Sequence, residues 1–178
     1  KYESPSASVP SITWGDVVLN AGPIPKELYP LFLSCYDKTI LENSYLYDGV
    51  RDMLTNLKKN EWRIGLCTNK PELQANILLT KLNIRSFFCS FIGSDTIGIA
   101  KPNPEPLIEA IRVLGGKENY SVLIGDTKTD FLTAKASGTK SLLVNYGHGA
   151  LVGDISLLKP DATVNSPKEI NDVLNNLF

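Results

Sequence analysis

A parallel, doubly wound α/β fold is predicted by the order of segments from about residue 45 onward. Short apolar runs of strand length alternate there with amphipathic segments that have the spacing of helices. Strands separated by helices of about ten residues form a parallel sheet with helices on its faces. In such sheets ligands bind beyond the carboxyl ends of the strands.

The expected elements follow one another with few residues between them. Strands are predicted at residues 63–67, 88–92, 121–124, 141–145 and 162–164. Helices are predicted at residues 50–60, 71–82, 104–114, 131–137 and 167–177. Pro71 suits the first turn of its helix, where a missing N–H costs nothing, and Gly138 suits a helix end.

The first 44 residues differ from the rest. Residues 1–10 are rich in serine and proline and are expected to form a tail, whereas residues 26–41 carry an apolar stripe with helical spacing. We therefore predict two parts: residues 1–44 as a tail with a partial helical cap, and residues 45–178 as the α/β core.

Composition excludes several classes of partner. A net charge of −1 over 178 residues gives no reason to expect a nucleic acid or an anionic membrane, and no apolar run reaches membrane-spanning length. Cys35, Cys67 and Cys89 are scattered in apolar contexts without a Cys-x-x-Cys pair. This usage predicts buried thiols in a cytoplasmic protein. The sequence does not set an oligomeric state.

Two carboxylates dominate the most informative segment. The apolar run at residues 122–124 ends in Gly125-Asp126, and Asp130 follows four residues later. Two negative charges at one turn repel each other, so a compensating cation is expected. Hard oxygen ligands suit Mg²⁺, which in turn suits phosphate chemistry.

Other polar residues are predicted at the same edge of the sheet. Thr68 and Asn69 follow the first strand, Asp95 follows the second, and Lys101 opens the loop before the next helix. A hydroxyl, backbone N–H groups and an ammonium group bind phosphate, while carboxylates bind Mg²⁺.

Each residue also has a structural interpretation. Thr68 could cap the next helix, Lys101 could be a solvated loop lysine, and Asp130 could be a helix N-cap. We expect Asp95 to be a structural turn residue and His148, the only histidine, to be a loop residue.

The order of these segments adds a resemblance. Residues 68–70, 101–104 and 125–130 resemble the second, third and fourth motifs of the haloacid-dehalogenase-like (HAD) hydrolase superfamily, in its phosphoglycolate-phosphatase-like branch. The resemblance extends over roughly residues 30–178. It implies a Rossmann-like core and a Mg²⁺-dependent phosphatase acting on a small phosphomonoester such as phosphoglycolate.

The resemblance also implies a role for each residue. Thr68 would donate a hydrogen bond to the phosphoryl group, Asn69 would support that loop, and Lys101 would neutralise charge on the phosphate and the nucleophile. Asp126 would hold Mg²⁺, and Asp130 would support the metal site. The reaction would pass through an aspartyl-phosphate.

The first motif of the superfamily, a strand ending in Asp-x-Asp-Gly-Thr, is absent from this sequence. In members of the superfamily, the first Asp of that motif is the nucleophile. Asp37 is the nearest candidate, but it lies in the helical stripe, and Ile40 stands where glycine is expected. We therefore expect a fragment that lacks the first strand and part of the cap. The alternatives are a catalytically inactive binding or structural module and an unrelated α/β fold.

Overall fold

The computed structural model describes residues 26–28, 44–152 and 157–178. The chain divides into two units, Lys1–Tyr45 and Leu46–Phe178. In the first unit, only the 3₁₀ turn η1 (Lys26–Leu28) and residues 44 and 45 are described. The rest of the predicted partial cap, including Asp37, therefore lies outside the described residues.

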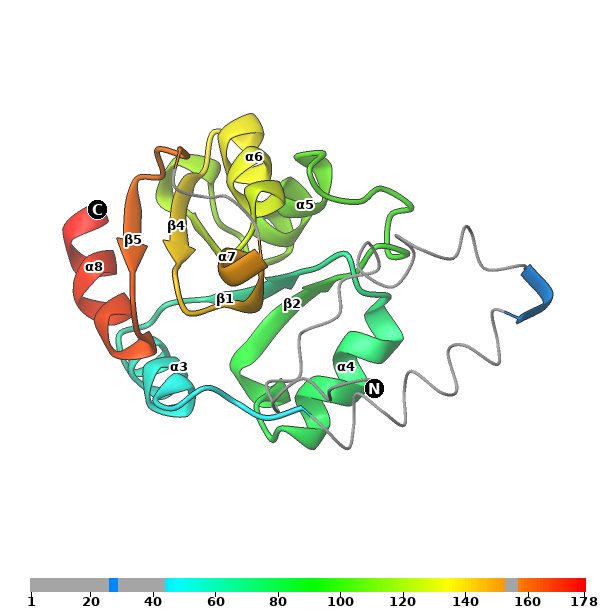
Figure 1. Cartoon of the computed structure of the whole chain (residues 1–178), viewed down its shortest axis with the longest axis horizontal. Coiled ribbons are helices and arrows are strands. Elements are labelled where there is room, and N and C mark those ends of the chain that lie inside the picture. The colour runs from blue at the N-terminus through cyan, green and yellow to red at the C-terminus, as the bar shows by residue number, and fades with distance from the viewer. Residues whose placement is uncertain (1–25, 29–43, 153–156) are drawn as a thin grey trace, which may run out of the picture. The chain divides into compact units, whose positions relative to one another are not determined.

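The predicted α/β class with parallel strands is confirmed in the second unit (Figure 1). Its described strands form two parallel sheets rather than one continuous sheet. One contains β1 (Ile64–Cys67) and β2 (Phe88–Ile92), and the other has the order β3 (Val122–Gly125), β4 (Lys140–Val144), β5 (Ala162–Val164). Each strand lies within one residue of its predicted position, because strand-length apolar runs mark strands well.

The helices differ from prediction mainly at their ends. They are α3 (Val50–Lys59), α4 (Glu72–Lys81), α5 (Glu105–Val113), α6 (Lys128–Ser137), α7 (His148–Val152) and α8 (Ile170–Leu177). Helix α6 begins three residues earlier than predicted, and α8 is preceded by a 3₁₀ turn at Pro167–Glu169. The expectation that His148 lies in a loop was wrong, since it is the first residue of α7.

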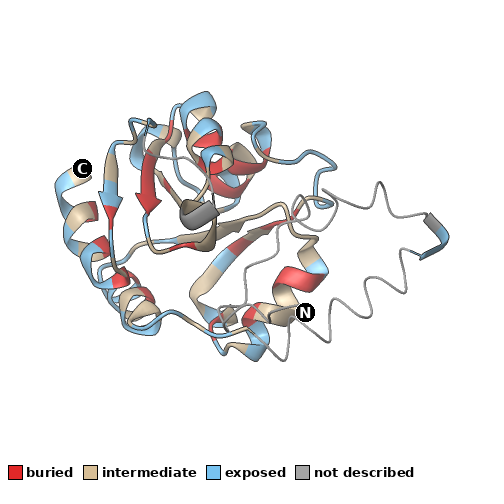
Figure 2. Ribbon diagram, viewed as in Figure 1, coloured by how far each residue is buried: buried red, intermediate tan, exposed pale blue. Residues whose placement is uncertain are grey.

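Helices cover both faces of the β3–β4–β5 sheet. One apolar cluster joins this sheet to α3 and α8, through Leu57, Leu142, Val164 and Leu174. Another joins β3 to α5 and α6. Strand β4 lies between its neighbours and is the most buried of the strands, as Figure 2 shows. Its continuous apolar run is typical of a parallel strand that is covered on both faces.

The described cysteines only partly match the expectation of buried thiols. Cys67 is half-buried at the end of β1, and burial raises the pKa of its thiol. Cys89 is exposed, so the prediction was wrong there. An apolar context predicts burial poorly on a strand, because alternate side chains point to opposite faces.

Candidate active site

Thr68 lies at the carboxyl end of β1 and extends its hydrogen-bond ladder. Its backbone N–H donates to the carbonyl of Ile92 at 2.9 Å, and its hydroxyl accepts from the N–H of Lys70 at 3.1 Å. The interpretation of Thr68 as a helix cap was wrong, because the N-cap position of α4 is Pro71. The hydroxyl therefore organises the loop that follows β1.

Asp95 has the structural role that we expected. Its Oδ1 accepts a hydrogen bond from the backbone N–H of Glu72, the first residue of α4, at 2.8 Å. A carboxylate at that place satisfies an N–H that the helix leaves unpaired. It also interacts favourably with the positive end of the helix dipole.

Asn69 connects the loop after β1 to the loop that contains Lys101. Its Nδ2 donates to the carbonyl of Lys101 at 3.0 Å, and the N–H of Lys101 donates to its Oδ1 at 2.8 Å. An asparagine amide can make this reciprocal pair because it carries both a donor and an acceptor. The two bonds hold the backbone at Lys101 close to the end of β1.

Lys101 forms a buried ion pair with Asp130. Its Nζ lies 2.6 Å from Oδ1 of Asp130, and the two side chains are only 11% and 10% exposed. The interpretation of Lys101 as a solvated loop residue was therefore wrong. The pair links the loop before α5 to the first turn of α6.

A capping box holds the other oxygen of Asp130. Thr127 is the N-cap of α6, and its Oγ1 accepts from the N–H of Asp130. In return, Oδ2 of Asp130 accepts from the N–H of Thr127 at 3.1 Å and from its hydroxyl at 2.6 Å. Asp130 is thus the third residue of the helix, not the N-cap that one interpretation made it.

Asp130 is ionised in this environment. Burial by itself raises the pKa of a carboxyl group, but the Lys101 ammonium and the hydrogen bonds from Lys101 and Thr127 outweigh burial. The pKa of Asp130 consequently lies below its ordinary value. Both of its oxygens accept hydrogen bonds from protein donors.

Among the described residues, one oxygen of Asp126 is bonded to protein and the other is not. Its Oδ2 accepts from the N–H of Gly149 at 2.7 Å, whereas Oδ1 accepts no hydrogen bond from any described residue. Gly147 and Gly149 pack directly against this segment, and a Cβ at Gly147 would overlap the Asp126 side chain. Sequence analysis missed both glycines, although the Gly147-His148-Gly149 spacing after a strand was a signal.

Tyr146 directly precedes Gly147 and packs against the apolar cluster that includes Leu142 and Val164. Burial first, and then the neighbouring Tyr47, Glu169 and Asp126, raise the pKa of Tyr146 to about 12. Its ring packs edge-on against the ring of Tyr47, with 5.4 Å between the centroids. Tyr146 is therefore a neutral neighbour of the Asp126 carboxylate.

The predicted site residues gather at the carboxyl edge of both sheets. Thr68 and Asp126 directly follow β1 and β3, and the bonds from Asn69 to Lys101 to Asp130 connect the two strand ends. The charges of Lys101 and Asp130 also act on Cys67, the last residue of β1. Lys101 thus contacts Asn69 through its backbone and Asp130 through its ammonium, whereas Thr68 and Asp126 adjoin this network along the chain, next to Asn69 and Thr127.

The donor set at this edge fits a weakly held Mg²⁺. No group of three or more histidine, cysteine or acidic side chains suited to a metal occurs in the described part of the chain. Mg²⁺ is often held by one or two carboxylates together with water and substrate phosphate. The uncommitted Oδ1 of Asp126 is one such oxygen.

The chain is similar in sequence to known proteins. A family model described as haloacid dehalogenase-like hydrolase matches residues 11–144. The chain belongs to this family. It is 33% identical over 155 residues to a phosphoglycolate phosphatase from Chromobacterium violaceum, covering 87% of this chain and 68% of that protein. It is 37% identical over 125 residues to one from Colwellia psychrerythraea, covering 70% and 55%.

Solved structures of HAD-like proteins share the fold. A predicted phosphoglycolate phosphatase from Haemophilus somnus aligns with a TM-score of 0.74 and 23% identity, over 85% of this chain and 69% of that one. A HAD phosphatase from Thermococcus onnurineus aligns with a TM-score of 0.71 and 20% identity, over 82% and 70%. At 23% and 20% sequence identity, the similarity to these two structures establishes the fold alone. The chain spans about half to two thirds of the length of the curated relatives it matches.

No helix in the described part of the chain is both long enough and apolar enough to cross a membrane.

Proposed function

We propose that this chain is the major part of a Mg²⁺-dependent phosphomonoester hydrolase that acts on a small phosphorylated metabolite of the phosphoglycolate type. The observation that carries the proposal is the fixed position of Lys101, whose backbone is held by Asn69 and whose ammonium is held by Asp130. It lies at the same sheet edge as Oδ1 of Asp126, which accepts no hydrogen bond from the described residues. A fixed cation beside a hard oxygen ligand suits a phosphate dianion and its metal.

Each residue has a part in this proposal. The Thr68 hydroxyl and the backbone N–H groups that follow it bind the phosphoryl oxygens, and the Lys101 ammonium offsets their negative charge. Asp126 contributes Oδ1 to Mg²⁺, which when bound supplies charge stabilisation to the phosphoryl group. Asp130 keeps Lys101 in position, because a buried lysine held by a carboxylate has few alternative rotamers.

Hydrolysis also requires a group that attacks phosphorus. Asp126 and Asp130 are the carboxylates described in this network; the first is assigned to the metal and the second is bonded on both oxygens. In the proposed reaction, an attacking carboxylate therefore comes from outside the described residues. It displaces the alcohol of the substrate and forms an aspartyl-phosphate that water then hydrolyses.

A second candidate function follows from the same observation. Without an attacking carboxylate, the edge would bind a phosphomonoester and Mg²⁺ without turnover. The chain would then be a binding module.

Release of inorganic phosphate from phosphoglycolate and from p-nitrophenyl phosphate tests the proposal, with Mg²⁺ and with EDTA. The key variant is Asp126→Asn. Asp161→Asn is the control, because Asp161 bonds to Ser141 near the amino ends of β4 and β5, at the opposite edge. The chain itself should show negligible turnover, because the first motif is absent from its sequence. When the assayed protein also carries an attacking carboxylate, we expect Mg²⁺-dependent turnover that Asp126→Asn abolishes and Asp161→Asn retains.

Equal loss in both variants, or turnover in EDTA, would refute the assignment of Asp126. Isothermal titration of the chain with Mg²⁺ and phosphoglycolate tests the site that both candidates share. Binding that requires Asp126 supports that site, and the absence of binding removes both candidates. Turnover gained when an attacking carboxylate is supplied would separate the hydrolase from the binding module.

A further inference from the structure

Charged residues at the ends of the described α-helices follow a common pattern. Acidic residues lie in the first turns of α3, α4, α5, α6 and α8, and lysine or arginine lies in the last turns of α3, α4, α5 and α6. This arrangement is favourable because the helix dipole is positive at the N-terminal end and negative at the C-terminal end. Among the described α-helices, Arg51 in α3 and Lys128 in α6 are the lysine or arginine residues in a first turn, where the dipole disfavours them.

Contacts in the structure account for Arg51 but not for Lys128. The guanidinium of Arg51 donates to the carbonyls of Leu82 at 2.8 Å and Asn83 at 2.9 Å, at the C-terminal end of α4. Lys128 is exposed, and its side chain makes no hydrogen bond or ion pair with any described residue. A residue that breaks a local rule without a compensating contact is typical of a functional position.

Lys128 stands between the two carboxylates of the candidate site. Asp126 precedes it by two residues, and Asp130 follows it by two. The reciprocal bonds between Thr127 and Asp130 fix the first turn of α6, and Asp130 in turn holds the ammonium of Lys101. The backbone that carries Lys128 is therefore held at the carboxyl end of β3, beside the proposed phosphate and metal site.

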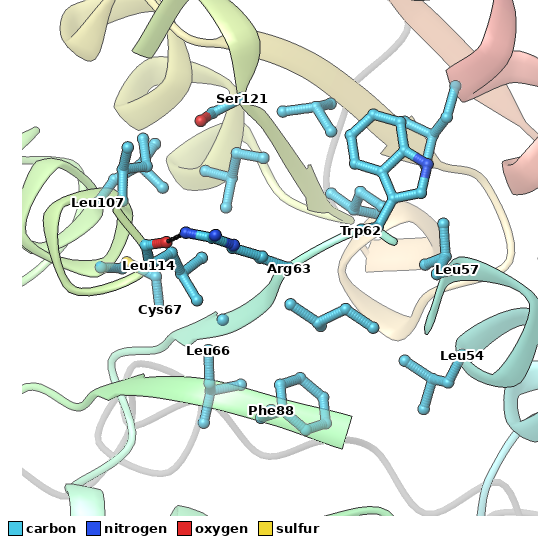
Figure 3. Close-up of a pocket in the computed structure, with 18 of the residues that line it drawn as sticks. Leu54, Leu57, Trp62, Arg63, Leu66, Cys67, Phe88, Leu107, Leu114 and Ser121 are labelled. Carbon is cyan, nitrogen blue, oxygen red and sulfur yellow. Dashed lines mark hydrogen bonds between the residues drawn. The ribbon is translucent and has the colours of Figure 1, made fainter. Parts of the chain in front are cut away.

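The apolar cavity between β1 and β3 offers no free cation to the alcohol part of a substrate. Its volume is about 350 Å³, and Arg63 is the charged residue among the described residues that line it. Figure 3 shows the Arg63 guanidinium at the carbonyl of Leu114, to which it donates at 2.6 Å. A carboxylate in this cavity would lose its hydration against apolar side chains, which is costly. At the sheet edge, by contrast, the ammonium of Lys128 is exposed and bonded to no described residue.

We propose that Lys128 is a specificity-determining residue of the phosphatase site. Its ammonium binds the carboxylate that phosphoglycolate carries on its alcohol part, so the site selects esters of anionic alcohols over esters of neutral alcohols. A bound carboxylate offsets the repulsion between Lys128 and the helix dipole, and a charge-assisted hydrogen bond is stronger than a neutral one. The inference rests on the proposed function, because Lys101 and Asp126 must hold the phosphate and Mg²⁺ at the same edge.

A comparison of two ligands tests this role without turnover. Phosphoglycolate and ethyl phosphate carry the same phosphate on a chain of two carbons, but phosphoglycolate alone carries the carboxylate. Isothermal titration of the full chain with each ligand in saturating Mg²⁺ gives two dissociation constants, and their ratio is the preference for the carboxylate. We expect Lys128→Met to weaken phosphoglycolate binding at least about tenfold and ethyl phosphate binding less than about twofold.

Three further variants locate the effect. Lys128→Arg keeps the positive charge and should retain the preference for phosphoglycolate. Lys135→Met removes an exposed lysine from the last turn of the same helix and should change neither dissociation constant. Lys70→Met tests the lysine that follows Asn69 in the loop after β1, and it should leave the preference unchanged.

The stability of Lys128→Met separates a binding role from a structural one. Because the dipole disfavours Lys128, the variant should unfold in urea at the same denaturant concentration as the parent or at a higher one. The preference of the parent for phosphoglycolate should also shrink as salt is added, since screening weakens an exposed ion pair.

Several results would overturn the assignment of Lys128. These are a parent chain without a preference, an unchanged preference in Lys128→Met, an equal loss for both ligands, and a lower unfolding midpoint. Loss of the preference in Lys70→Met alone would place the carboxylate at Lys70 instead. Any of these results in a chain that binds both ligands removes the role of Lys128 and leaves the proposed function standing. If the parent binds neither ligand, the proposed phosphate site fails as well.

Discussion

Replacement of Lys101 by methionine should destabilise the protein strongly, although Lys101 lies in a loop. The ammonium lies 2.6 Å from Asp130, and both side chains are about nine-tenths buried. The variant leaves the Asp130 carboxylate buried without its cation. Removal of one partner from a buried ion pair costs about 3–5 kcal/mol.

The structure places the expected value at the lower end of that range. Asp130 keeps two hydrogen bonds from Thr127, which continue to stabilise its charge. We therefore expect the free energy of unfolding to fall by about 3 kcal/mol for Lys101→Met. Asp130→Asn in the same chain removes the orphaned charge, so the double variant should recover about 1–2 kcal/mol of that loss.

Urea unfolding followed by circular dichroism at neutral pH measures these differences. Lys81→Met is the control, because Lys81 is exposed on α4 and its loss should change the free energy by no more than about 0.5 kcal/mol. A loss below about 1 kcal/mol for Lys101→Met would refute the reasoning, because a buried pair in this geometry cannot be that weak. A double variant less stable than Lys101→Met would refute it as well.

Three further predictions concern the same edge of the sheet. The folded-state pKa of Asp130 is lowered, so its contribution to stability is present above its ordinary pKa of 3.8 and is lost as pH falls through the lower folded value. Below pH 3.8, the free energy of unfolding should therefore fall less steeply with pH in Asp130→Asn than in the parent. A similar steepness in both proteins would contradict this. Thr127→Ala should lower the free energy of unfolding in urea by about 1–2 kcal/mol, since the N-cap is lost, and Thr127→Ser should lower it by less than half of that. Equal losses in the two variants would rule out the hydroxyl as the cause. Gly147→Ala should displace the Asp126 side chain and weaken Mg²⁺ binding, measured by calorimetry, at least about tenfold. Gly116→Ala is the control: its new Cβ meets a side-chain methyl at 3.3 Å, and it should bind Mg²⁺ as the parent does. Unchanged binding in Gly147→Ala would remove Asp126 from the metal site.

The strands and the positions of the polar residues at their ends were predictable from local patterns. An apolar run of strand length followed by Gly125-Asp126 marks a strand end without knowledge of its neighbours. Helix ends were less predictable. The start of α6 was missed because Thr127 and Asp130 form a reciprocal cap, and either residue alone is equally typical of a turn.

Contacts between distant segments were not predictable in this way. Asn69 and Lys101 are 32 residues apart, and their backbone clamp depends on how two loops meet after folding. Gly149 and Asp126 are 23 residues apart, and the glycine is required only because α7 turns back over the end of β3. Local periodicity carries no information on such pairings.

The sequence by itself determined the class of fold, the order of its strands along the chain and the position of Thr68 and Asp126 after strand ends. These features depend on apolar periodicity and parallel connectivity, which involve residues close together in the chain. Only the tertiary structure decided what these side chains do there. It pairs Lys101 with Asp130, leaves one oxygen of Asp126 uncommitted and separates the strands into two sheets around an apolar cavity. Those outcomes depend on packing and burial, which arise where distant segments meet.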